Sequence, residues 1–423
     1  MQVRSIVSYF SGSLGTTGIS MVASLLVARW TAPAQMGMWN LALLIVTYTS
    51  VLQLGVFNGL NRQLPYFAGR RDTEKARRRA EVALAWCALL TVASVAIVAL
   101  VALVFWWRSQ LDAAVTTLAI GAVLASSWSL QYLTVCYGVS SQFGELARKS
   151  TLVALAGLLM VLLVRSFGYG GLLVRAAVLA VLGSLALYIG RPVRAPARWD
   201  QPIFVELMRV GFPIWMLGQL SALFMTLDRL ALADSPQALG YYTVAAQFAS
   251  LSYMVPTAVN AVLYPQMARE YGESHLAMNL WRKAAKAALW AGAASLCAAA
   301  LAWLVIPYFL DYFLPAYVPG TTAAQWAALT GVAMSLSVFG NIFNVLGRQQ
   351  LYALAAAVGV ATFCGVWFML THMSSQTRMV CAAQSMLLAS LATSATSAVL
   401  SRVTCRHHDR KAQVSTSALG ASS

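Results

Sequence analysis

Two adjacent charged residues, Asp228 and Arg229, lie inside a long apolar stretch of this sequence, where a charge needs a partner. If the stretch spans a membrane, each buried charge costs at least about 2.5–3.5 kcal/mol, so both side chains should face protein or water. Three roles are open for them: an ion pair that locks helices together, snorkelling of the arginine to the membrane surface, or contact with a substrate or a coupling ion.

Other arginines could bind an anionic group, because a guanidinium makes charge-assisted and often bidentate hydrogen bonds to phosphate. Arg29, Arg165 and Arg175 could hold a diphosphate at the outer side of a membrane, or they could anchor helices at its edge. Arg62, with Asn58 one helical turn before it, could meet a diphosphate at the inner side, or Arg62 could simply mark topology.

Seven side-chain amides also fall within apolar stretches: Gln53, Gln131, Gln219, Gln247, Asn260, Asn341 and Asn344. An amide both donates and accepts hydrogen bonds, so each could contact sugar hydroxyls. Each could equally join two helices, an interaction that contributes about 0.6 kcal/mol on average. Asn341 and Asn344 are about one turn apart and should share a helix face. Together with the arginines, these residue types suit a substrate that is both anionic and rich in hydroxyls.

Catalytic chemistry finds no support in the sequence. The four histidines have no metal-ligand spacing, no glycine-rich phosphate loop is present, and no two carboxylates share an apolar stretch. The six cysteines lie singly and suit packing. We therefore expect no enzyme activity, no metal and no cofactor. A membrane glycan polymerase or ligase is the best enzymatic alternative, but such families are similar in having a long periplasmic loop, and here the longest outer connection is about a dozen residues.

The composition indicates that these residues lie in a membrane. Of the 423 residues, 60% are hydrophobic and 10% are charged, against roughly 45–50% and 25% in soluble domains. Apolar runs of about 20 residues, enough to cross a bilayer as a helix, predict twelve spans. They lie near residues 5–28, 36–60, 82–106, 113–136, 150–165, 170–190, 210–233, 240–264, 286–309, 321–346, 350–371 and 379–400.

The distribution of the 29 Lys and Arg residues predicts the orientation of these spans. Most of them fall in the even-numbered connections and near the two ends, and basic residues accumulate on the cytoplasmic side of a membrane. We therefore expect both termini in the cytoplasm, in a multi-pass protein of a bacterial inner membrane without a cleavable signal peptide. The basic run Arg70–Arg79 should bind anionic membrane lipids. Topology thus accounts for the net charge of +16, and no nucleic acid partner is expected.

The sequence repeats itself after 203 residues. The segment Pro33–Ala42 matches Pro236–Ala245 without gaps in its proline, its glycine, an aromatic residue and its alanine, and Gln63 matches Gln266 at the same offset. Each copy opens with an odd-numbered span, so both have the same orientation. Parallel repeats of six helices imply two lobes related by an axis along the membrane normal, with a substrate path between them.

These observations predict an all-α polytopic membrane protein with about 12 transmembrane helices in two parallel-repeat six-helix lobes. The N-terminal lobe is expected to comprise residues 1–190 and the C-terminal lobe residues 210–400, joined by a basic cytoplasmic linker at 191–209. Residues 401–423, rich in Ser, Ala and basic residues, are expected to form a disordered cytoplasmic tail because they lack the apolar content to fold.

Short motifs in both copies of the repeat carry a family resemblance. They are Leu54–Arg62, Phe67–Arg71, Leu207–Pro213, Thr226–Leu230, Leu239–Ala245 and Leu263–Pro265. Together they resemble the polysaccharide (O-antigen type) flippases of the multidrug, oligosaccharidyl-lipid and polysaccharide exporter superfamily. The resemblance implies a V-shaped pair of lobes that alternates between inward-open and outward-open states. It also implies a polyprenyl-diphosphate-linked oligosaccharide as substrate, moved to the periplasmic leaflet for surface polysaccharide biosynthesis alongside other polysaccharide assembly proteins.

Under this interpretation a coupling proton or sodium ion drives transport. The candidate substrate-binding residues are Arg229, Asp228, Arg62, Arg29, Arg175, Asn58, Gln219 and Asn260. A drug/cation antiporter of the same superfamily is an alternative, but it would need several acidic residues in its cavity, and the spans offer Asp228. The excess of arginine favours an anionic substrate. A non-transporting scaffold for glycan assembly is a further alternative, which a transport assay would separate.

Overall fold

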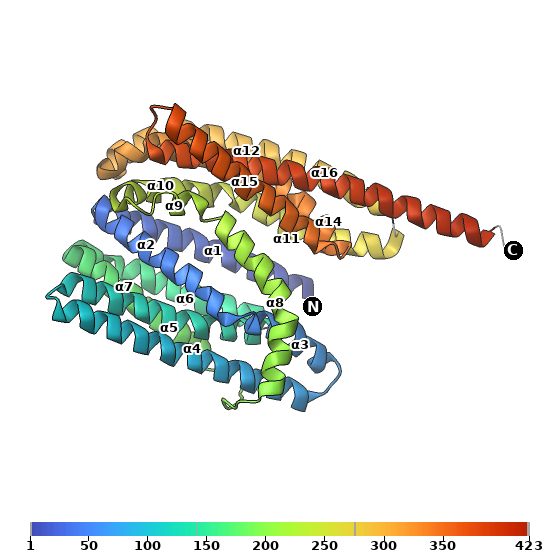
Figure 1. The fold of residues 1–423 in the computed structure, drawn as a ribbon, viewed down its shortest axis with the longest axis horizontal. Coiled ribbons are helices and arrows are strands. Elements are labelled where there is room, and N and C mark those ends of the chain that lie inside the picture. Colours follow the sequence, from blue (N-terminus) through green and yellow to red (C-terminus); the bar gives the residue numbers. More distant parts are fainter. Residues whose placement is uncertain (1, 141, 275, 421–423) are drawn as a thin grey trace. The chain divides into compact units, whose positions relative to one another are not determined.

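The computed structural model describes residues 2–140, 142–274 and 276–420. The regular secondary structure of these residues is helical (Figure 1). The α-helices are α1 (Gln2–Arg29), α2 (Pro33–Thr49), α3 (Val56–Gly69), α4 (Thr73–Trp107), α5 (Leu111–Val139), α6 (Phe143–Leu159), α7 (Val161–Tyr188), α8 (Gln201–Phe224), α9 (Leu227–Leu230), α10 (Pro236–Ser252), α11 (Met254–Ser274), α12 (Ala277–Phe313), α13 (Thr321–Met334), α14 (Gly340–Val345), α15 (Gln349–Met373) and α16 (Arg378–Gly420). Short 3₁₀ helices are η1 (Ser50–Gln53), η2 (Pro315–Gly320) and η3 (Ser335–Phe339).

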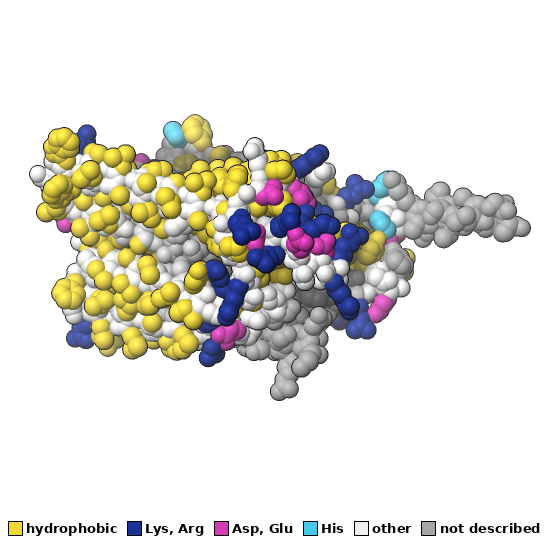
Figure 2. Space-filling view, turned by 90° about the horizontal axis from the view of Figure 1, so that it is seen from below, with side chains coloured by type: hydrophobic (Ala, Val, Ile, Leu, Met, Phe, Trp, Pro, Cys, Tyr) yellow, Lys and Arg dark blue, Asp and Glu magenta, His cyan; other side chains and the backbone are white. Residues whose placement is uncertain are grey.

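Long apolar helices confirm the predicted fold class. Nine helical segments in the described part of the chain are long and apolar enough to cross a membrane. The other predicted spans coincide with α1, α6 and α10, and both α6 and α10 have 17 residues, at the lower limit of about 17–25 for a spanning helix. Figure 2 shows hydrophobic side chains over much of the visible face and a cluster of charged side chains in one part of it. The chain is an all-α polytopic membrane protein of about twelve transmembrane helices.

Contacts divide the chain into two compact units. Unit 1 comprises Met1–Ala32 and Leu41–Gln219, and unit 2 comprises Pro33–Asn40 and Leu220–Ser423. In unit 1, α4 packs against α5, α5 against α7, and α1 against α6 (Figure 1). In unit 2, α15 packs against α16, and α13 against α10 and α12. Residues 191–219, expected to be a linker and the start of the second lobe, belong to unit 1.

Several predicted spans are interrupted in the structure. In each of them, a turn or a 3₁₀ segment separates two α-helices, for example η3 between α13 and α14. Irregular backbone at membrane depth is tolerated where it faces protein or lines a water-filled cavity, because lipid cannot satisfy its polar groups. Broken helices are therefore the first place to look for a binding site. The interrupted spans are 36–60, 150–165, 210–233, 240–264 and 321–346.

The break between η1 and α3 places α8 against α3 in unit 1. Leu54 and Gly55 have positive φ angles of 51° and 80°, a conformation that costs glycine little. The backbone of Gly55 also touches that of Gly211 in α8, so a methyl group added to either glycine would overlap the other's backbone. This close approach is one of the contacts that hold the first part of α8 within unit 1.

The two copies of the 203-residue repeat meet inside unit 2. A methyl group added to Gly37 would overlap the carbonyl group of Pro236, and one added to Gly240 would overlap that of Pro33. Asn40 Nδ2 donates a hydrogen bond of 2.5 Å to Oγ1 of Thr243, which is the residue 203 positions later in the chain. Reciprocal contacts of this kind are what a local two-fold relation between equivalent segments produces. The repeat in the sequence therefore has a counterpart in the packing.

The C-terminal segment is helical where the sequence analysis expects disorder. α16 continues to Gly420, while residues 421–423 lie outside the described part of the chain. Cys405 is buried in the hydrophobic core of unit 2. Asp409 accepts hydrogen bonds from the backbone N–H groups of Ala277 (2.7 Å) and Met278 (2.9 Å), and it thereby satisfies donors at the start of α12. Disorder was expected from the composition of the segment alone, and composition does not reveal partners such as Ala277 and Met278, which lie far away in the sequence.

Candidate functional site

A polar cavity of about 290 Å³ lies in unit 2 among the broken helices; it is called the amide cavity below. Its lining combines amide, hydroxyl and aromatic side chains, and none of its described lining residues is charged. These residues are Tyr253, Pro256, Thr257, Asn260, Met334, Ser337, Gly340, Asn341, Asn344 and Tyr352. The candidate residue Asn260 therefore lies at a cavity. Asn341 and Asn344 face the same cavity, which confirms the prediction from their spacing.

A chain of hydrogen bonds orders one wall of the amide cavity. Asn341 Nδ2 donates to Asn260 Oδ1 at 2.9 Å, and Asn260 Nδ2 donates to Ser337 Oγ at 3.1 Å. These bonds join α14, α11 and η3. The oxygen of Asn341 and the whole amide of Asn344 have no protein partner among the described residues. An amide offers two donor hydrogens and one acceptor oxygen, so these groups are available to a ligand.

Local backbone features keep the amide cavity open. η3 replaces part of an α-helix between α13 and α14, and α10 ends immediately before Tyr253. Pro256 follows in the first turn of α11, where a missing N–H removes no helical hydrogen bond. The ring of Tyr352 packs over Gly340, where an added methyl group would lie 3.3 Å from ring carbons. A proline in the first turn of α11 and a glycine beneath the Tyr352 ring therefore lie where the cavity forms.

Asp228 and Arg229 do not form an ion pair with each other in the described structure. Asp228 lies in α9 of unit 2, and 6% of its surface is exposed. Its Oδ2 atom accepts a hydrogen bond from the Tyr242 hydroxyl at 2.9 Å, and its Oδ1 atom accepts one from the backbone N–H of Arg229 at 2.8 Å. The Nε atom of Arg229 is buried without a partner among the described residues. The hydrogen bonds to the carboxylate therefore come from neutral donors, and the Arg229 charge interacts with it electrostatically without a direct ion pair among the described residues.

A second cavity, of about 350 Å³, lies in unit 1 beside α3 and is called the arginine cavity below. It combines one exposed guanidinium, that of Arg62, with aromatic rings. The lining residues are Arg62, Gln63, Tyr66, Phe67, Glu206 and Val210. The candidate residue Asn58 lies one turn earlier on α3 and is half-buried. A cationic group next to aromatic surface suits an anionic head joined to an apolar chain.

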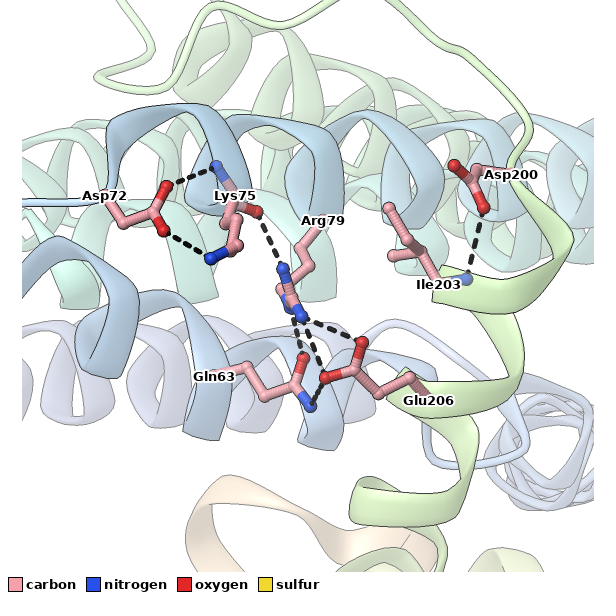
Figure 3. A network of polar contacts seen from close by, with 7 residues as sticks. All are labelled: Gln63, Asp72, Lys75, Arg79, Asp200, Ile203 and Glu206. Carbon is pink, nitrogen blue, oxygen red and sulfur yellow. Dashed lines mark hydrogen bonds and ion pairs between the residues drawn. The ribbon is translucent and has the colours of Figure 1, made fainter. Parts of the chain in front are cut away.

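A network around Arg79, next to the arginine cavity, was missed by the sequence analysis (Figure 3). Arg79 Nη2 donates to both carboxylate oxygens of Glu206 at 2.8 Å, and Nε donates to Gln63 Oε1 at 2.7 Å. Gln63 Nε2 in turn donates to Glu206 Oε1 at 3.0 Å. The guanidinium also lies over the ring of Phe67, 3.9 Å from its centroid. The basic run that is predicted to bind lipids includes Arg79. However, only 6% of the surface of Arg79 is exposed, and its side chain instead joins α4 to α3 and α8.

Two capping residues position the members of this network. Asp72 accepts a hydrogen bond from the backbone N–H of Lys75 at 3.1 Å, at the start of α4. The hydrogen bond from the Lys75 side chain lowers the pKa of Asp72 below its ordinary value, because it stabilises the charged carboxylate. Asp200 accepts a hydrogen bond from the backbone N–H of Ile203 at 3.3 Å, at the start of α8. Glu206 then lies in the second turn of α8, where it reaches α4.

The remaining candidate residues lie in different surroundings. Gln219 Nε2 donates to Ser50 Oγ at 3.1 Å, and so joins α8 to η1. Arg175 Nε donates to the carbonyl oxygen of Gly157 at 2.9 Å, and so joins α7 to α6. Arg29 ends α1 and is exposed. The guanidinium carbon of Arg165 lies 5.9 Å from the centroid of the Trp30 ring.

The long apolar helices and their interruptions define a polytopic all-α membrane protein, in which two cavities lie beside broken spans. The chain matches the model of a family described as polysaccharide biosynthesis protein over residues 26–310. It therefore belongs to this family of polysaccharide biosynthesis proteins, and the resemblance carried by the short motifs is confirmed. No match is found among curated proteins.

Solved transporter structures share this fold. A multidrug resistance MATE family transporter of the MOP superfamily, in an inward-facing conformation, matches with a TM-score of 0.70 at 15% identity, over 92% of this chain and 96% of that chain. The lipid II flippase MurJ, in an inward closed conformation, matches with a TM-score of 0.71 at 10% identity, over 92% and 86%. A MOP superfamily transporter from Pyrococcus furiosus matches with a TM-score of 0.63 at 16% identity, over 96% and 97%. At these identities the likeness shows the fold.

Proposed function

We propose that this protein translocates a polyprenyl-diphosphate-linked oligosaccharide from the cytoplasmic to the periplasmic leaflet of a bacterial inner membrane. It does so by alternating access, as a step in O-antigen-type surface polysaccharide biosynthesis. The amide cavity carries this proposal, because its uncharged donors and acceptors match sugar hydroxyls. Membership of a polysaccharide biosynthesis family and a fold shared with a lipid II flippase support it.

The diphosphate needs cationic partners that the amide cavity lacks. Arg62 is the first candidate, because its guanidinium lines the arginine cavity beside aromatic side chains. Arg229 is the second, because its buried Nε has no partner among the described residues. Arg29 and Arg175 are further candidates on the outer side, and Asn58 and Gln219 could contact the glycan. Guanidinium groups make strong bidentate hydrogen bonds to phosphate, so even one well-placed arginine contributes substantially.

Asp228 is the candidate for binding the coupling ion, a proton or a sodium ion. Its carboxylate is buried and is held by the Tyr242 hydroxyl and a backbone N–H rather than by a cation. A buried carboxylate that has no direct ion-pair partner gains stability from either a proton or a metal cation. Anionic lipids are proposed partners of the exposed residues of the basic run, and other polysaccharide assembly proteins are proposed to deliver and receive the glycan.

Vesicles containing the purified protein should move a short-chain prenyl-diphosphate oligosaccharide across the bilayer. The measurement is the glycan's accessibility to an impermeant glycan-modifying enzyme outside. Arg62→Ala and Arg229→Ala should each slow transport by about tenfold or more, since a charge-assisted hydrogen bond is lost, with lysine variants intermediate. Arg78→Ala is the matched control, because Arg78 forms an exposed pair with Glu74. Normal transport by both test variants would eliminate the diphosphate site, whereas transport of cationic dyes but not of the glycan would favour the drug/cation antiporter.

The proposed orientation predicts which connections a membrane-impermeant thiol reagent can reach in intact cells. A single cysteine placed within residues 310–320 should be labelled, and one placed within 70–79 or 191–198 should not, in a background without the native cysteines. The physical reason is the retention of basic connections in the cytoplasm. Permeabilised cells serve as the control, because all three positions should then react. Labelling of 70–79 in intact cells would invert the proposed topology and the direction of transport.

A further inference from the structure

The amide cavity has a chemical selectivity that goes beyond binding a glycan in general. We propose that it recognises an uncharged sugar residue, a neutral hexose or an N-acetylamino sugar, and that it discriminates against acidic sugars such as uronic acids. This inference rests on the proposed function and specifies which class of sugar residue the substrate presents to unit 2.

The available hydrogen-bonding groups of the cavity match an uncharged sugar. Asn341 uses one N–H on Asn260, which leaves its oxygen and its second N–H for a ligand. Asn344 and Thr257 line the cavity and are exposed, so they are accessible from outside the unit. These groups both donate and accept, as sugar hydroxyls do. The amide of Asn344 could also pair with an acetamido group, each donating to the other's oxygen.

An acidic sugar finds no counter-charge in the same cavity. None of the described lining residues is an arginine, lysine or protonatable histidine. A carboxylate moved from water into such a site loses hydration that neutral amides replace in part only. Sites built from neutral hydrogen-bonding groups therefore select by leaving the wrong ligand's polar groups unpaired. The cavity should consequently bind the neutral form of a sugar residue more tightly than its carboxylate analogue.

The volume of the amide cavity and the aromatic rings in its lining limit recognition to about one sugar residue. Its volume of about 290 Å³ lies just under the range of roughly 300–1,000 Å³ for small-molecule pockets. Tyr253 and Tyr352 contribute aromatic rings to the lining, and the Tyr352 ring is placed by its packing over Gly340. An aromatic face covers the apolar side of a sugar ring while the amides bind its hydroxyls. The rest of the oligosaccharide would lie outside this cavity.

Two synthetic ligands test the inference with the unaltered protein. One is farnesyl diphosphate linked to N-acetylglucosamine, and the other is farnesyl diphosphate linked to glucuronic acid. Calorimetric titration of the full chain in lipid nanodiscs should show at least about tenfold tighter binding of the N-acetylglucosamine compound. The diphosphate and the prenyl chain are common to both ligands, so the difference reports the sugar. Equal affinities, or tighter binding of the glucuronic acid compound, would overturn the inference.

A charge introduced into the cavity should reverse this preference. Asn344→Arg adds a cation at an exposed position of the lining, and should make the glucuronic acid compound the tighter ligand. Asn279→Arg is the matched control, because Asn279 lies in α12 and is not among the lining residues, and it should keep the wild-type preference. An unchanged preference in a folded Asn344→Arg protein that still transports glycan in vesicles would refute the inference and leave the proposed function standing. If neither ligand binds and vesicle transport fails, the proposed function falls as well.

Discussion

Glu206→Ala is expected to destabilise the folded protein by about 2–3 kcal/mol, because it leaves Arg79 buried without its carboxylate. Removing one partner of a fully buried ion pair costs roughly 3–5 kcal/mol. The expected value is lower here because 43% of the Glu206 side chain is exposed, while 8% of the Arg79 side chain is. The measurement is the fraction of protein that stays monodisperse in detergent after heating, compared with the unaltered chain.

Glu74→Ala is the matched control for this substitution. Glu74 forms an ion pair with Arg78 at 2.7 Å, but both side chains are largely exposed, at 73% and 59%. Exposed pairs of this kind contribute about 0.3–0.5 kcal/mol, so the control should be nearly neutral. Glu206→Gln should fall between the two, because it keeps an acceptor oxygen for Arg79 and loses the charge. Equal stability of the Glu206→Ala and Glu74→Ala proteins would mean that the Arg79 network does not hold α4, α3 and α8 together.

Gly240→Ala is expected to destabilise the folded protein by about 1–3 kcal/mol or more, because it overpacks a close contact between two helices. The added methyl group would overlap the carbonyl group of Pro33, which is backbone and cannot rotate away. α10 and the start of α2 would have to separate, and the hydrogen bond between Asn40 and Thr243 would be strained. The yield of folded, membrane-inserted protein and its thermal stability in detergent should both fall.

The reciprocal packing of the repeat adds a second expectation for the same contact. Gly37→Ala should have a similar cost, but the double variant with Gly240→Ala should cost less than the sum, because one separation of the segments relieves both overlaps. Gly365→Ala in α15 is the control, since nothing lies near its added methyl group. In that helix alanine should be neutral or stabilise by up to about 1 kcal/mol. Additive costs would argue against a shared two-fold contact.

Features that depend on local composition were predictable from the sequence. The apolar runs predict the spanning helices because a bilayer requires about 20 apolar residues whatever the rest of the fold does. The 203-residue repeat is visible because both copies keep their proline and glycine positions, and these residues restrict the backbone directly. The shared face of Asn341 and Asn344 was predictable for the same reason, since residues one turn apart on a helix are neighbours.

The interruptions of the spans and the end of the chain were harder to predict. Nothing in the apolar run at 321–346 distinguishes the 3₁₀ segment η3 from the α-helices on either side. α16 continues past the last predicted span because Cys405 and Asp409 find partners in α11 and α12. Composition describes how a segment behaves by itself, and it carries no information about a surface contributed by another part of the chain.

The sequence by itself determined the class of protein, the number of its spans and its family, because hydrophobic length, repeat offset and short motifs can be compared along the chain. Tertiary structure alone decided which polar residues meet. Asn341 reaches Asn260 across 81 residues, and Arg79 reaches Glu206 across 127. Membrane helices are apolar on most sides, so no hydrophobic stripe in the sequence reveals which face meets a neighbour, and close packing and hydrogen bonds between helices make that choice.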